Sequence, residues 1–253
     1  MPWRPARRAV AAAVLLAWAV GIAFLAHRRH SGSDAELLAR GALRLEPETY
    51  FYTIVQDHHQ IGSASSSVDT SASGFTAREV ARVRTLIAGD SQSVVATSVA
   101  YLSHALVLDS FSIAVSGQPP LREVIPPSAK SSVLLPTLVP IVLMLTRQPR
   151  VRATPEVQVF NPIARRVERV TMSIAAESLL NVVDSTIFDS VQHRWIAAHL
   201  DTVRSWQIVT PSRGIEAWVV ARGRIVAASE PGGLSIGRTT YEMATLNPKL
   251  RTH

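Results

Sequence analysis

The chain has 253 residues, no cysteine and a formal net charge of +7. The lack of cysteine excludes disulfides, thiolate metal sites, cysteine nucleophiles and lipid attachment through an N-terminal cysteine. Five of the 26 basic residues flank an apolar segment near the N-terminus, which leaves 21 basic against 19 acidic residues from position 31 onward, so we expect no nucleic-acid partner.

The apolar segment, residues 9–26, contains eighteen residues without a charge, at the lower limit for one membrane-spanning helix. A cleaved signal peptide is the alternative, but its apolar part is usually shorter and ends at a pair of small residues. Here Phe24 stands near the exit and arginines follow directly. We therefore predict that residues 1–30 are a retained anchor with basic flanks.

The flanking charges predict the orientation of this anchor. Three arginines precede the segment and two follow it, and this slight excess favours a cytoplasmic N-terminus. We expect a single-pass inner-membrane protein whose C-terminal domain lies in the periplasm. Residues 31–48 are predicted as a helical juxtamembrane spacer, because Ser33 and Glu36 have capping-box spacing and Pro47 ends the pattern.

From Thr49 onward the pattern changes to that of strands. Aromatic and β-branched residues run to Val55, and a polar break at 57–60 predicts a hairpin into a Ser/Thr-rich run ending near Ser73. Residues 75–84 alternate, with Phe75 on one face and Arg78 on the other. Further strands are predicted at 94–102, 106–115, 157–160, 166–175, 195–209 in one or two pieces, 216–220 and 224–228.

Residues 133–145 are the exception, an apolar run that contains Pro136 and Pro140. The run is too short to cross a membrane, and the two prolines disfavour one continuous helix. The favoured interpretation is a short helix that starts near Pro140 and packs on the sheet. The alternative is an interfacial or ligand-gating element.

These elements predict a mainly β fold: a strongly curved, open barrel-like antiparallel sheet with one or two short helices, preceded by a single transmembrane helix. The β-rich domain is expected over 49–246, followed by a tail at 247–253. Amphipathic strands leave one apolar face of the sheet uncovered, and the proline-broken apolar segment is expected to pack on that concave face.

Several segments then carry a resemblance. They are Tyr52 with Ile61-Gly62-Ser63, Leu106-Val107-Leu108-Asp109-Ser110-Phe111, Val159-Phe160-Asn161-Pro162, Ala217-Trp218-Val219 with Gly223-Arg224-Ile225-Val226, and Glu230-Pro231-Gly232-Gly233-Leu234 with Arg238-Thr239-Thr240-Tyr241-Glu242. Together they resemble the bacterial envelope domain that often precedes a transglutaminase-like domain, which is similar to the curved-sheet lipoprotein-carrier type. The resemblance implies a bent sheet with helices in its concave face, suited to an acyl chain or a partner segment, and implies no catalysis.

Motifs for catalysis and metal binding are weak. Residues 233–237 match G-x-S-x-G, but a nucleophile needs a strand before it, a helix after it and then an acid and a histidine, and only Glu242 and the terminal His253 remain downstream. We therefore expect a glycine-rich loop. His193, His199 and Asp201 share one strand face, but residues six apart on a strand are about 20 Å apart, beyond joint metal ligation. No metal or cofactor is predicted.

If the sheet encloses a cavity, we expect large apolar side chains to line it: Phe75, Phe111, Leu143, Trp195, Trp206 and Trp218. The leading hypothesis is a non-enzymatic, membrane-anchored periplasmic domain that binds a hydrophobic ligand, such as a lipid or acyl chain, or an envelope protein partner. One alternative is an envelope assembly subunit that pairs through a sheet edge. A second alternative is an envelope hydrolase with an acid/histidine pair.

Overall fold

The computed structural model describes residues 42–43, 45–87, 90–125, 133–146, 149–161 and 164–246. The predicted anchor at 1–30, most of the predicted spacer and the tail at 247–253 lie outside these residues. Within the described part of the chain, no helix has both the length and the apolar character needed to cross a membrane.

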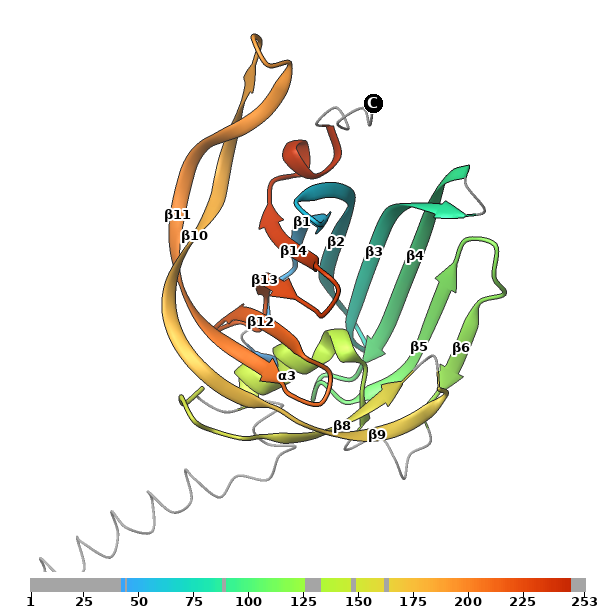
Figure 1. Cartoon of the computed structure of the whole chain (residues 1–253). Helices are drawn as coiled ribbons and strands as arrows, with labels where there is room; N and C mark the ends of the chain where they lie inside the picture. Colours follow the sequence, from blue (N-terminus) through green and yellow to red (C-terminus); the bar gives the residue numbers. More distant parts are fainter. Residues whose placement is uncertain are drawn as a thin grey trace, which may run out of the picture.

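One large antiparallel sheet of eleven strands forms the body of the molecule (Figure 1). In hydrogen-bonding order its strands are β10 (Ser173–Asp189), β11 (Arg194–Thr210), β12 (Ile215–Val220), β13 (Ile225–Ser229), β14 (Leu234–Thr239), β1 (Glu48–Gln56), β2 (His59–Ser71), β3 (Gly74–Ile87), β4 (Asp90–Leu102), β5 (Leu108–Val115) and β6 (Leu121–Val124). Neighbours in this order are also consecutive in the chain, except that β14 pairs with β1 and so joins the two halves of the sheet.

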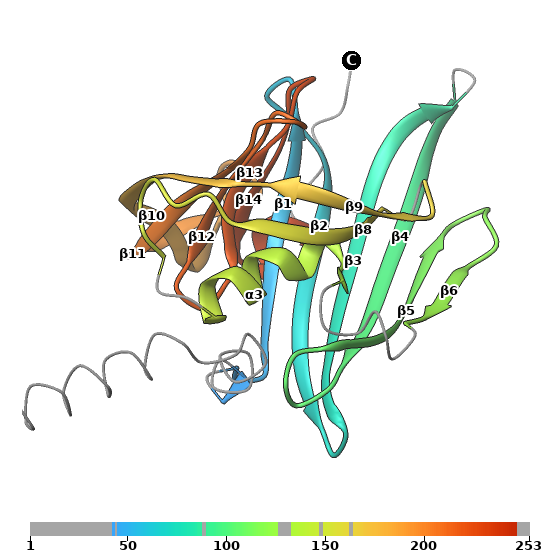
Figure 2. The ribbon, with the colours of Figure 1, turned by 90° about the horizontal axis from the view of Figure 1, so that it is seen from below.

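A second, three-stranded sheet contains β7 (Val133–Leu134), β8 (Glu156–Asn161) and β9 (Arg166–Thr171). Between β7 and β8 come a 3₁₀ turn, η1 (Pro136–Leu138), and the helix α3 (Val139–Thr146). A short π-helix, η2 (Glu242–Leu246), follows the last strand. Figure 1 shows the large sheet curving around α3, and Figure 2 shows β8 and β9 running across the helix.

The prediction of a mainly β fold with a curved antiparallel sheet and few helices is therefore confirmed for the described residues. The sheet does not close into a barrel, because its end strands β6 and β10 do not pair with each other among those residues. The predicted hairpin at 57–60 is present with a two-residue turn. Asp57 and His58 both have positive φ, 49° and 67°, as the turn type that suits strand twist requires.

The apolar run at 133–145 forms a short helix near Pro140, as predicted. Both prolines lie in the first turn of a helical element, Pro136 in η1 and Pro140 in α3, where a missing N–H removes no hydrogen bond. Helix α3 packs between two apolar clusters. Ile141 and Leu145 contact a cluster from β3 to β5, whereas Val139 and Met144 contact a cluster from β8 to β12. A helix that is apolar on all sides accordingly contacts apolar residues on both of these sides.

Three predictions about strands need correction. Residues 166–175 form two strands instead of one, since the chain leaves the small sheet and enters the large one at Met172. The expected glycine-rich loop at 233–237 is mostly strand β14, because β13 and β1 supply hydrogen-bonding partners on both sides and override the low strand propensity of glycine. Most of β10 lacks the alternation that marks a strand and was not predicted.

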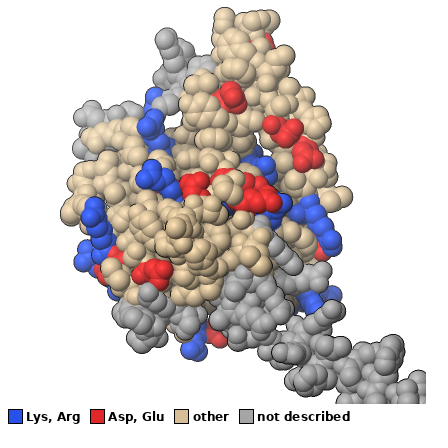
Figure 3. Space-filling model, turned by 180° about the vertical axis from the view of Figure 1, so that it is seen from behind, with Lys and Arg blue, Asp and Glu red and all other residues tan. Residues whose placement is uncertain are grey.

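The surface opposite to that of Figure 1 carries charges of both signs. Figure 3 shows acidic and basic side chains next to one another on this face, with neither sign forming a continuous patch. Some opposite charges of the molecule form ion pairs between neighbouring strands. Nε of Arg169 on β9, for example, lies 3.2 Å from Oε1 of Glu156 on β8.

Candidate functional site

A cavity of about 160 Å³ lies between the start of α3 and the inner face of the large sheet. Strands β1, β2, β3, β13 and β14 contribute walls, and η1 and α3 contribute the remaining side. Its apolar lining includes Ile141, Ile225 and Ile236. One acidic and one basic side chain, Glu79 and Arg224, share the same space.

Small side chains explain why a cavity exists at this place. Ala64 and Ser66 on β2 lie opposite Ala81 and Glu79 on β3, and all four line the cavity. Neighbouring positions of the same inner face carry larger residues, including Val68 and Phe75, which are buried in the first apolar cluster. Because α3 rests on these larger residues, the short side chains between them leave space beneath the helix.

Glu79 is a partly buried carboxyl on a strand face that is otherwise apolar. Burial raises its pKa to about 7 from an ordinary value of 4.5, while a hydrogen bond with Thr137 and the positive charge of Arg224 oppose that shift. A carboxyl with this pKa is present in both its protonated and its ionised form near neutral pH. The side chain is therefore able to accept or donate a hydrogen bond to a bound group.

Arg224 is the basic side chain of the cavity and is 3% exposed. Its Nη1 and Nη2 atoms are both buried and have no hydrogen-bond partner among the described residues. The guanidinium carbon lies 5.3 Å from the centre of the Tyr50 ring, within the range of a cation–π contact. Natural proteins pair nearly all buried polar groups, so an unpaired buried guanidinium calls for a functional explanation.

Close backbone packing holds Arg224 at the cavity. The preceding residue, Gly223, has φ of 77°, and a side chain there would place Cβ 2.2 Å from Cα of Ile141 in α3. Glycine is thus required at position 223 for two reasons: the positive φ of the backbone, and the close approach of the β12–β13 turn to the helix. This contact fixes the start of β13 beside the first turn of α3.

A row of polar contacts connects the cavity with the surface. The Tyr50 hydroxyl donates a 2.6 Å hydrogen bond to Glu48, and Arg238 also lies over the Tyr50 ring, at 4.4 Å. Arg222, half-exposed, donates to both Glu46 and Glu48. On the cavity side, burial raises the pKa of Tyr52, so its hydroxyl stays protonated over the working pH range.

The residues around the cavity combine charged and apolar side chains. No histidine lines the cavity. Among the described residues, no group of three histidine, aspartate or glutamate side chains is placed to hold a metal ion. One free cation, one carboxyl that titrates near neutrality and an apolar wall together define a pocket for a small amphipathic group with negative charge.

The six side chains predicted to line a cavity lie elsewhere, and none of them is among the residues around this one. Phe75 and Phe111 belong to the first apolar cluster, with the Phe111 ring 5.0 Å from that of Phe160. Leu143 and Trp206 pack in the second cluster. Trp195 and Trp218 are half-buried in β11 and β12. Their role in ligand binding stays a prediction.

The histidine and serine motifs are also separate from the cavity. His199 lies 3.4 Å from Asp184 across the β10–β11 pair, with both side chains mostly exposed, and His193 forms part of the hairpin turn. Ser235 lies within β14, opposite Val55 of β1. A serine inside a paired strand lacks the sharp strand-to-helix turn that exposes a nucleophile.

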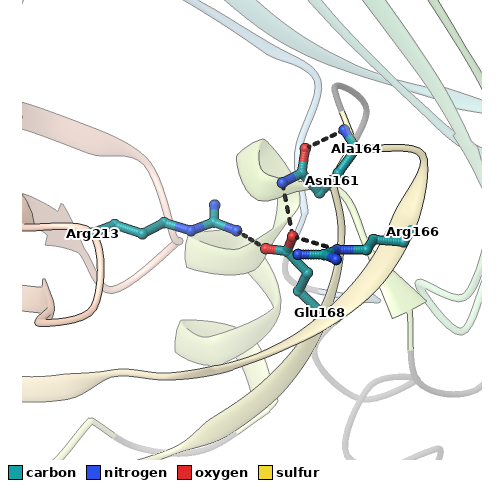
Figure 4. A network of polar contacts seen from close by, with 5 residues as sticks. All are labelled: Asn161, Ala164, Arg166, Glu168 and Arg213. Atoms are coloured by element: carbon teal, nitrogen blue, oxygen red, sulfur yellow. Dashed lines mark hydrogen bonds and ion pairs between the residues drawn. The ribbon is translucent and has the colours of Figure 1, made fainter.

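A second polar cluster joins the small sheet to the large one (Figure 4). Glu168 of β9 accepts hydrogen bonds from Asn161 at 3.0 Å, Arg166 at 3.1 Å and Arg213 at 2.7 Å. The hydrogen bond from Asn161, followed by that from Arg166, lowers the pKa of Glu168. Because three donors already occupy this carboxylate, the cluster is a structural link between β9 and the β11–β12 turn.

Glu79 and Arg224 were not recognised as site residues in the sequence. The alternation over 75–84 contained a signal for Glu79, because position 79 has the same parity as Phe75, Ala77 and Ala81 and falls on their buried face. A lone carboxylate on an apolar strand face is unusual and marks a candidate site. Arg224 follows a turn glycine, and nothing in the local pattern indicates that its side chain is buried.

Fold and site together define a mainly β, barrel-like domain with a small cavity beside α3. The β-barrel-like protein of domain of unknown function DUF1849 from Brucella abortus has a similar structure, with a TM-score of 0.50 and 12% sequence identity over 78% of this chain and 96% of that chain. This similarity supports the barrel-like β fold, without extending to the transglutaminase-preceding or lipoprotein-carrier type. No family model and no curated protein sequence matches the chain.

Proposed function

We propose that this protein is a non-enzymatic binding domain that holds a hydrophobic ligand between α3 and the curved sheet. The observation that carries the proposal is the cavity of about 160 Å³ with Ile141, Ile225 and Ile236 in its wall. An engineered cavity of about 150 Å³ with apolar walls binds benzene, so a space of this size holds a ligand or part of one.

Native mass spectrometry of the full chain released from detergent micelles tests this proposal. We expect a bound small amphipathic molecule in the native chain and its loss in Ala81→Leu, which fills the cavity. Ala114→Leu is the matched control, because Ala114 is exposed on β5 and the substitution leaves the cavity unchanged. An adduct that persists in Ala81→Leu would show that the ligand binds at another place.

We further propose that residues 9–26 anchor the domain in the inner membrane, with the N-terminus in the cytoplasm and residues 49–246 in the periplasm. The arginines on both sides of the apolar segment support this orientation. Alkaline phosphatase fused after His253 should be active and β-galactosidase fused there inactive. The opposite pattern of reporter activities would refute this orientation.

A second candidate function, assembly through a sheet edge, is favoured by strand β10. From residue 176 onward this strand pairs only with β11 within the described part of the chain. Its exposed apolar side chains, Leu179 at 67% and Ile187 at 57%, are unusual for a solvent-facing edge. Leu179→Lys should abolish co-purification of an envelope partner and leave ligand binding in the cavity intact.

A further inference from the structure

Arg224 is a cation buried at the cavity wall without a counter-ion in hydrogen-bonding range. Both Nη atoms lack partners among the described residues, so Glu79 does not bond to them. A buried charge without a partner is strongly unfavourable, whereas the same charge paired with an anion is tolerated. The cavity beside Arg224 therefore has the electrostatic requirement for an anionic ligand.

A carboxylate satisfies this requirement better than a phosphate. The two free Nη groups match the two oxygens of one carboxylate in an end-on bidentate pair. Glu79 occupies the same cavity, so a group with two negative charges would be repelled whenever Glu79 is ionised. A monoanion leaves the pocket neutral when Glu79 is protonated and carries at most one excess negative charge when it is not.

The rest of the cavity is suited to an alkyl chain. Ile141, Ile225 and Ile236 form an apolar wall, and Ala64 and Ala81 form the floor without polar side-chain atoms. Benzene, with six non-hydrogen atoms, fills an engineered cavity of about 150 Å³. Butanoate also has six non-hydrogen atoms, so the volume corresponds to a carboxylate carrying about three carbons.

We propose that the cavity binds the carboxylate end of an aliphatic monocarboxylate, with Arg224 pairing with the carboxylate oxygens. Thr137 and Glu79 flank this group, and the isoleucine wall contacts the alkyl carbons. Both Nη atoms are shielded from solvent, so binding includes a rotation of the guanidinium toward the cavity. The inference rests on the proposed binding function and specifies its ligand class.

Saturation-transfer NMR with the full chain in deuterated dodecyl maltoside micelles tests the proposal. The probes are butanoate, its neutral counterpart 1-butanol and propylphosphonate, the last at a pH above its second pKa so that it is a dianion. Each is compared with empty micelles at the same pH. We expect butanoate to bind most tightly. Arg224→Met should weaken butanoate binding about 10- to 100-fold, the range for a hydrogen-bonded charge, and leave 1-butanol binding unchanged.

Two variants locate the binding. Ala81→Leu should abolish binding of both butanoate and 1-butanol, and Ala114→Leu should abolish neither. Ser66→Val fills the same space with a smaller side chain and replaces Ala81→Leu if that variant does not fold.

Octanoate that competes with butanoate would identify the end of a longer acyl chain as a ligand, and octanoate that does not compete would identify short free acids.

The outcomes separate this inference from the proposed function. Binding of 1-butanol that is lost in Ala81→Leu, together with butanoate binding that does not depend on Arg224, would retain the cavity and overturn the carboxylate site. Tighter binding of propylphosphonate than of butanoate would also overturn it. Failure of every probe to bind in the cavity would overturn the proposed function itself.

Discussion

Two carboxylates, Glu168 on the small sheet and Glu79 on the large one, have very different surroundings in this molecule. Glu168 lies near the surface and accepts hydrogen bonds from Asn161, Arg166 and Arg213. Glu79 lies in the cavity, where the pKa is raised by burial and Arg224 leaves both Nη atoms without a partner. The first region is complete by itself. The second leaves a buried guanidinium without a hydrogen-bond partner, which under our proposal a ligand supplies.

The largest effect is expected from Gly223→Ala, which breaks the packing that builds the cavity. A Cβ there would lie 2.2 Å from Cα of Ile141, and φ is 77°. Gly117→Ala is the matched control, with φ of 79° and no atom within 4 Å. We expect Gly223→Ala to lower the unfolding free energy by about 3 to 5 kcal/mol and Gly117→Ala by about 1 kcal/mol. Equal losses in urea denaturation would show that the turn does not press against α3.

Replacing Glu79 by Gln should remove a pH dependence from the stability of the domain. The folded state holds a proton on Glu79 up to about pH 7, whereas the unfolded chain releases it near its ordinary value of 4.5. Stability of the native chain therefore falls as pH rises between these two values, by about 3 kcal/mol in total. Glu79→Gln should match the native Tm at pH 4 and exceed it at pH 8. Parallel curves across that window would mean that Glu79 titrates normally.

A smaller effect of the same kind is expected from Arg224→Met. Methionine is similar in length and removes the buried charge together with its contact to Tyr50. At pH 5, where Glu79 is protonated, we expect the variant to be more stable by about 1 to 2 kcal/mol, as when apolar residues replace buried charges. Greater stability combined with loss of butanoate binding would show that Arg224 serves binding at a cost in stability, in contrast to Glu168, which stabilises the fold. A loss of stability would assign Arg224 a structural role.

The smallest effect is expected from Glu168→Gln in the surface cluster. The lowered pKa means that Glu168 stabilises the fold above its unfolded pKa and loses this contribution as pH falls through the folded value. The variant should have a slightly lower Tm at pH 7, and high salt should reduce the difference by screening. Ligand binding should stay unchanged. Weaker binding of butanoate in this variant would mean that the link to β9 supports the cavity.

Several elements of the fold could be predicted from the sequence, whereas the residues around the cavity could not. The hairpin at Asp57 and His58, the alternation after Phe75 and the helix at Pro140 arise from periodicity and turn chemistry within a few residues. They were predicted and are present. None of the large apolar side chains predicted to line a cavity is among the residues around the cavity beneath α3, where short side chains on β2 and β3 leave the space, and their role in ligand binding stays a prediction.

The sequence by itself determined that the domain is mainly β, that its strands follow one another in antiparallel order and that α3 is buried, since each of these depends on local pattern. Only the tertiary structure decided the rest. It placed β14 beside β1, which are separated by nearly the whole domain, and it brought Arg224 next to α3 and across from Glu79. These contacts join residues that lie far apart in the chain, and no periodicity in the chain encodes such distances. The candidate site is therefore a property of the fold.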